Sequence, residues 1–188
     1  MMRYLLAFLA IATTAMAQDK VLQDNGLQFW GKIFEVFSHP RCSNCHVGPD
    51  NLPMWSGPSY GPKARPHGMN IDAGPSRIGM ETIPCNACHT LHNSMVPHGP
   101  PGAEVWLLPP VEMQWSSVSS ADICAQIKDR NRNGERSIAD VVEHVEHNGL
   151  VGWGWDPGPG REPAPYSNTQ LAQFLKQWDA AGAPCPAK

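Results

Sequence analysis

The chain has 188 residues and a formal net charge of −3, which suits one domain or at most two very small ones. Its acidic balance argues against nucleic acid and anionic membranes as partners. The 17 glycines and 19 prolines indicate a loop-rich chain, while seven tryptophans and eight methionines argue against disorder because such side chains are costly to expose. We expect a chain of this kind to wrap around something large and apolar.

The N-terminus has the pattern of a cleaved secretory signal peptide. Arg3 supplies positive charge, Tyr4 to Ile11 form a short apolar run, and Ala15 to Ala17 form an A-x-A cleavage site. The apolar run is too short for a membrane span, and no later stretch approaches about 18 apolar residues. We therefore predict a signal peptide at residues 1–17 and a mature periplasmic domain at residues 18–188 with no membrane span; an uncleaved anchor is the alternative.

Four helices and three loop segments are expected along the mature chain. Trp30, Phe34 and Phe37 recur at helical spacing, which predicts an amphipathic helix over 25–37 that ends before Pro40. Serine N-caps and apolar stripes predict further helices over 119–128, 137–148 and 170–181. Proline and glycine predict loops over 51–84, 97–110 and 152–165. No segment alternates in the manner of a strand.

Two C-x-x-C-H motifs carry the chemistry of this sequence, at 42–46 and 85–89. Two thiols at this spacing add across the vinyl groups of one haem, and the following histidine binds the iron. Because the motif occurs twice behind an export signal, we predict two covalent haems c. The predicted haem-binding residues are Cys42, Cys45, His46, Cys85, Cys88 and His89.

The cysteines of the two motifs have three alternative uses besides haem attachment. Two C-x-x-C pairs could bind a structural zinc ion, although zinc requires no histidine after each pair. They could form disulfides in an oxidising compartment, whereas a thioredoxin-like redox motif would need a βαβ pattern that the chain lacks. The remaining cysteines, Cys124 and Cys185, are expected to form a disulfide, with free buried thiols as the alternative.

Each iron of a six-coordinate electron carrier needs a second axial ligand, His or Met. The sequence favours His67, then Met69 and Met113, then His144. Further candidates are Met54, Met80, His92, Met95 and His98. The choice stays open here, and it matters because a methionine raises the reduction potential relative to a second imidazole. Trp153 and Trp155 are expected to pack in the core, with shielding of a haem edge as the alternative.

Several segments together resemble one family of cytochromes. They are Phe37–His46, Pro66–Asn70, Cys85–His89 and the Trp-Gly-Trp loop from Gly152 through Pro163, with Cys124 and Cys185 in addition. The family consists of small dihaem c-type cytochromes associated with isoquinoline 1-oxidoreductase-type molybdenum hydroxylases. The resemblance implies that the chain takes electrons from a molybdenum/iron–sulfur hydroxylase and passes them to the respiratory chain. A looser resemblance, to the small dihaem subunit of periplasmic nitrate reductase, would send electrons towards a terminal reductase.

These observations lead to a defined expectation for fold and function. We expect a mainly α, small, loop-rich dihaem cytochrome c fold, with a few short helices packed around two haems. The expected function is outer-sphere electron transfer rather than catalysis. The rival classes are a haem enzyme such as a dihaem peroxidase, a haem sensor with one open iron site, and a zinc-stapled structural protein.

Overall fold

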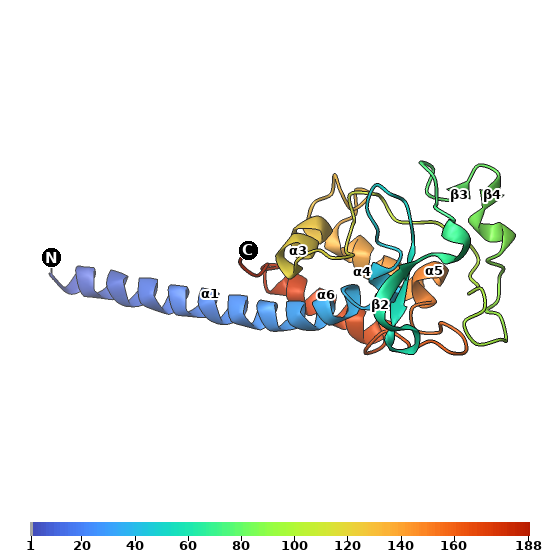
Figure 1. Cartoon of the computed structure of the whole chain (residues 1–188). Helices are drawn as coiled ribbons and strands as arrows, with labels where there is room; N and C mark the ends of the chain where they lie inside the picture. Colours follow the sequence, from blue (N-terminus) through green and yellow to red (C-terminus); the bar gives the residue numbers. More distant parts are fainter. Residues whose placement is uncertain (1) are drawn as a thin grey trace.

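The computed structural model describes the backbone of residues 2–188 and the side chains of residues 18, 20–61 and 63–188. The chain begins with the long helix α1 (Met2–Phe37), whose first half extends beyond the rest of the molecule, while its second half lies along α6 (Asn168–Ala180) (Figure 1). The side chains of the predicted signal peptide, residues 1–17, lie outside the described residues, so its cleavage stays a prediction. Among the helices that the structure describes, none is long and apolar enough to cross a bilayer.

The other helices begin where the sequence provides an N-cap. They are α2 (Pro40–Ser43), α3 (Ser120–Lys128), α4 (Ile138–His147) and α5 (Gly149–Gly152). The Ser119 hydroxyl accepts a hydrogen bond from the backbone N–H of Asp122, and Ser137 and Asp140 form a capping box at the start of α4. The predicted helices over 119–128, 137–148 and 170–181 are confirmed, with ends that differ by one or two residues.

The main core lies where α1, α3, α4 and α6 pack together. The rings of Trp30 and Trp178 meet at its centre with 5.1 Å between their centroids, and both side chains are buried. Ile33 from α1, Ile123 from α3 and Leu175 from α6 are fully buried beside them. A second, small cluster of Val47, Ala73 and Leu108 lies among the loops. Apolar side chains therefore fill the helical part of the molecule by themselves.

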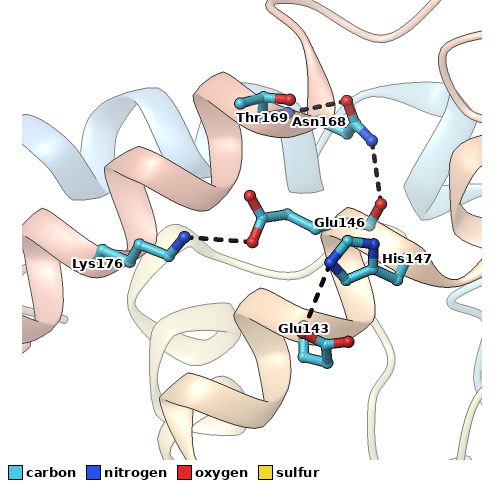
Figure 2. A network of polar contacts seen from close by, with 6 residues as sticks. All are labelled: Glu143, Glu146, His147, Asn168, Thr169 and Lys176. Carbon is cyan, nitrogen blue, oxygen red and sulfur yellow. Dashed lines mark hydrogen bonds and ion pairs between the residues drawn. The ribbon is translucent and has the colours of Figure 1, made fainter.

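Polar contacts at the surface tie α4 to α6 (Figure 2). The Lys176 ammonium lies 3.2 Å from the Glu146 carboxylate, and the Asn168 side-chain amide donates to the Glu146 carbonyl at 3.4 Å. His147 and Glu143 face each other at 3.7 Å along α4, both largely exposed. Exposed ion pairs of this kind contribute little to folding stability. The apolar contacts between the helices therefore hold α4 in place. This placement matters because α4 carries His144.

The loop region contains two small antiparallel sheets. β1 (Met54–Gly57) pairs with β2 (Gly61–Pro66), and β3 (Gly79–Met80) pairs with β4 (Ile83–Pro84). Three single 3-10 turns accompany them: η1 (Pro58–Tyr60), η2 (Gly68–Asn70) and η3 (Cys85–Ala87). Gly57 and Gly61, on either side of η1, have φ angles of 131° and 87°, which side chains with a Cβ rarely adopt. The two glycines therefore allow the chain to reverse between β1 and β2.

The expected fold class is wrong. Over residues 2–188 the structure has six α-helices and two small sheets, a mixed α and β architecture rather than a mainly α cytochrome c fold. The four helices of the core pack on one another, because each buries much of its apolar stripe against its neighbours. The strands escaped prediction because they are short and rich in proline and glycine, so no alternation of apolar and polar residues marks them.

The predicted disulfide between Cys124 and Cys185 is confirmed, and it joins α3 to the C-terminal segment across a sequence separation of 61. Replacing both cysteines by alanine is expected to lower the free energy of unfolding by about 4 kcal/mol, because the bond restricts a loop of this length in the unfolded chain. Urea denaturation measures the change. Wild-type protein with this bond reduced is the matched control and should lose a similar amount. A loss below about 1 kcal/mol in both samples would contradict the prediction.

Candidate functional site

Both C-x-x-C-H motifs fold as one helical turn. In the first, α2 continues so that the His46 N–H donates to the Cys42 carbonyl at 3.2 Å. In the second, η3 does the same, and the His89 N–H donates to the Cys85 carbonyl at 3.0 Å. Residues three and four positions apart lie on the same face of such a turn. Each motif therefore presents two thiols and an imidazole on one side, as attachment of one haem requires.

The two motif histidines are held in the same way. Nδ1 of His46 lies 2.8 Å from the Met113 carbonyl oxygen, and Nδ1 of His89 lies 3.0 Å from the Pro101 carbonyl oxygen. A carbonyl can only accept, so each Nδ1 carries the proton and each Nε2 keeps its lone pair for a metal. Such a contact behind a metal ligand fixes its tautomer and orientation.

A tryptophan stacks on each of these imidazoles. Trp115 lies parallel to His46, with ring centroids 3.4 Å apart and 3° between the planes. Trp106 stacks on His89 at 4.2 Å. Rotation of either imidazole would disrupt its stacking contact, so the two histidines have little freedom to turn. The two sites thus repeat one arrangement, although the segments that supply the tryptophans and carbonyls differ.

Each motif faces a cavity of its own. The His46 cavity has a volume of about 290 Å³ and is bordered by Cys42, Cys45 and His46. The His89 cavity has a volume of about 350 Å³ and is bordered by Cys85, Cys88 and His89. Four side chains line both cavities: Arg41, Cys45, Leu107 and Trp153. The cavities therefore share a wall, and groups held in them would be close neighbours.

His67 lies across the His89 cavity from His89. It follows β2, its N–H donates to the Pro53 carbonyl at 2.8 Å, and its Nδ1 faces the Gly68 carbonyl at 2.9 Å. The rings of His67 and His89 have centroids 5.8 Å apart. Two imidazoles on opposite sides of one iron have ring centres roughly 6 Å apart, since each nitrogen binds at about 2.0–2.1 Å. The spacing of this pair is close to that of two imidazoles that bind one iron.

His144 borders the His46 cavity together with His46. It is half-buried on the face of α4 that borders this cavity. Burial lowers the pKa of His46 to about 3; the proximity of His144 acts in the same direction, and the hydrogen bond that His46 donates to the Met113 carbonyl acts against both. Burial also lowers the pKa of His144. Both imidazoles are therefore neutral at neutral pH, the form that binds a metal.

The methionine candidates are placed less favourably. Met113 borders the His46 cavity as His144 does, but its carbonyl lies on the Nδ1 side of His46, and its side chain packs in the main core. The Met69 side chain borders the His89 cavity but is 80% exposed. Among the other candidates, Met95 is 89% exposed, and His98 borders the His89 cavity. The geometry thus favours His67 and His144 as partners of the motif histidines.

The four motif thiols do not favour the other cysteine chemistries. They are separate thiols, and burial raises the pKa of Cys42 to about 12 and that of Cys45 to about 11. A thiol–disulfide catalyst needs a lowered pKa instead. Within the described part of the chain, no group of three or more His, Cys, Asp or Glu side chains could hold a metal ion. The pairs therefore do not form the four-ligand set of a structural zinc site.

Three observations indicate that haem c fits the residues that surround the cavities. The thiols and imidazole of each motif share one face, each imidazole presents Nε2, and each cavity is lined mostly by apolar side chains with a second histidine across it. The sequence had not marked Trp106, Trp115 and Arg41 as site residues. Only Arg41 had a visible signal, a charge directly before a motif. Trp155 packs against the main core as expected, whereas Trp153 lies in the shared wall.

Comparison of the chain with protein-family models, with curated proteins and with solved structures finds no match.

Proposed function

We propose that this chain is an exported, periplasmic electron-transfer protein that holds two haems c, one on each C-x-x-C-H motif. The observation that carries the proposal is the repeated arrangement of His46 and His89. Each donates through Nδ1 to a backbone carbonyl, stacks on a tryptophan and borders its own cavity. Two half-buried imidazoles, each held through Nδ1 and stacked on a tryptophan at neighbouring cavities, are what a pair of haem sites needs.

The residues of the chain would act by holding, orienting and shielding. Cys42 and Cys45 would hold one haem and Cys85 and Cys88 the other, and each haem supplies one-electron redox chemistry at its iron. His46 and His144 would bind the iron of the first haem, and His89 and His67 would bind the iron of the second. Two imidazoles per iron leave no open position, which favours a relay over a haem enzyme or a sensor. The common wall would keep the two redox centres close, so that electrons can enter at one and leave at the other.

The proposed partners come from the sequence resemblance. The donor would be a molybdenum/iron–sulfur hydroxylase and the acceptor a component of the respiratory chain. The acidic surface expected of the mature chain suits docking on a basic patch of a partner protein. Feeding a terminal reductase such as periplasmic nitrate reductase is the alternative assignment, with the same chemistry and the opposite direction of electron flow.

Expression of the full chain with the c-haem maturation machinery tests the proposal. We expect a coloured periplasmic protein that begins at Gln18, carries two covalent haems by mass, is fully reducible and does not bind carbon monoxide. The control is the same chain expressed without the maturation machinery, which should remain colourless. A colourless product in both cultures would contradict the haem assignment and favour zinc or disulfides. Carbon monoxide binding by one haem of the wild-type protein would favour an enzyme or a sensor instead.

A further inference from the structure

Four residues that border the His89 cavity each have a buried polar atom without a partner. The atoms are Arg41 Nε, Tyr60 Oη, His98 Nδ1 and Trp106 Nε1, and none has a hydrogen-bond partner among the residues that the structure describes. The guanidinium and the indole N–H can only donate, and the phenol can donate as well. Leaving such groups buried and unpaired costs free energy, so native proteins rarely do so. These atoms indicate that the occupant of this cavity carries hydrogen-bond acceptors.

The charge at one end of the cavity indicates the kind of acceptor. Arg41 is only 5% exposed, and its one hydrogen bond is from Nη2 to the Ser56 carbonyl at 2.7 Å. In the described part of the chain no carboxylate forms an ion pair with it, and the carboxylate of the nearby Glu162 accepts from the Ser59 hydroxyl instead. A buried guanidinium without a directly paired carboxylate is unfavourable by itself. An anionic acceptor would satisfy it.

Tyr60 and His98 lie together at the same cavity. Their ring centroids are 4.6 Å apart, and the backbone N–H of His98 donates to the Pro159 carbonyl at 3.1 Å. Arg161, two residues further along, also borders the cavity and is fixed by hydrogen bonds to the carbonyls of Pro157 and Gly99. Two arginines, a phenol and an imidazole thus border one cavity. Trp106 is assigned differently, because it stacks on His89.

We propose that Arg41, Tyr60, His98 and Arg161 form a carboxylate-binding site in the His89 cavity, and that this site takes the propionates of the haem held by Cys85, Cys88 and His89. The inference rests on the proposed function and adds the residues that recognise the anionic edge of the cofactor. Arginine pairs with carboxylates through two parallel hydrogen bonds, and in the side-on form one of them comes from Nε, the atom that is unpaired here.

The position of Arg41 in the shared wall makes the proposal specific. Arg41 borders both cavities, whereas Tyr60 and His98 border the His89 cavity alone. Loss of a positive charge beside a redox centre disfavours the reduced state. Replacing Arg41 by methionine is therefore expected to lower the potentials of both haems, with the equilibrium constant for reduction of the His89 haem falling about tenfold, or about 59 mV. Replacing Tyr60 by phenylalanine removes one hydrogen-bond donor and should lower only the potential of the His89 haem. The equilibrium constant for its reduction should fall about threefold.

The experiment uses the protein with both haems attached and two readouts, a spectroelectrochemical titration and the propionate bending bands in the resonance Raman spectrum. Tyr60→Phe is compared with Tyr166→Phe, a matched control whose hydroxyl donates to Glu35 at the surface. Arg41→Met is compared with Arg41→Lys, which keeps the charge without Nε. We expect Tyr60→Phe to change one potential and a propionate band, and Tyr166→Phe to change neither.

Two outcomes separate the inference from the proposed function. In the first outcome, Tyr60→Phe and Arg41→Lys both keep the wild-type potentials and propionate bands. That result would overturn the proposed carboxylate site and leave the assignment of two haems unaffected. A wild-type chain without covalent haem would overturn the proposed function, and the inference with it. If Arg41→Met does not fold, Tyr60→Phe and Arg41→Lys decide the question, because both are close in shape to the residues they replace.

Discussion

Replacing Cys85 and Cys88 by serine is expected to give a folded protein with one covalent haem instead of two. The second motif lies in η3, where Cys88 is exposed and Cys85 half-buried, and neither side chain belongs to the apolar clusters. Loss of its haem should therefore leave the helical core intact. Mass spectrometry measures the haem content, and circular dichroism measures the helix content.

The same replacement at Cys42 and Cys45 should have a larger effect, which makes it the comparison for the first variant. Cys42 packs against the main core, Cys45 packs against the small cluster, and Cys45 borders both cavities. We expect this variant to lose its own haem and to attach the second with reduced yield. Two haems retained in either double variant would contradict the assignment of one haem to each motif. Full attachment of the second haem in the Cys42 and Cys45 variant would contradict its larger expected effect.

Replacing His67 or His144 by alanine is expected to change the protein from one that binds no carbon monoxide to one that binds a single molecule. Each substitution removes the imidazole across a cavity from a motif histidine. At the His89 cavity the two rings are 5.8 Å apart, as two ligands of one iron require. Visible spectroscopy of the reduced protein under carbon monoxide measures the change, and the double variant should bind two molecules.

Met69→Ala and Met113→Ala are the controls for the histidine variants. Neither is expected to open an iron, since Met69 points largely into solvent and the Met113 carbonyl lies on the Nδ1 side of His46. Met113→Ala should destabilise the core instead, by about 2–5 kcal/mol. Carbon monoxide binding in Met69→Ala but not in His67→Ala would show that the methionine is the ligand at the His89 cavity.

The helices illustrate how far local sequence determines this fold. Ser137 and Asp140 form their capping box within one turn, and Val141 and Val145 lie on the same face because of helical spacing. Such interactions join residues three or four positions apart, so they can be read without knowledge of the tertiary structure. The strands are different, because β1 and β2 pair through glycine turns and proline-flanked residues that carry no periodic signal.

The sequence by itself determined the two motifs, and it predicted the bond between Cys124 and Cys185 because these are the two cysteines outside the motifs. Only the tertiary structure decided which histidines share a cavity with which motif. His144 borders the His46 cavity because α4 packs against α6, and Arg41 enters the shared wall because loops distant in sequence close around it. The physical reason is the sequence separation of the interacting residues. The geometry of a motif follows from hydrogen bonds within one turn, whereas a cavity is formed by distant segments that meet only when the apolar core is buried.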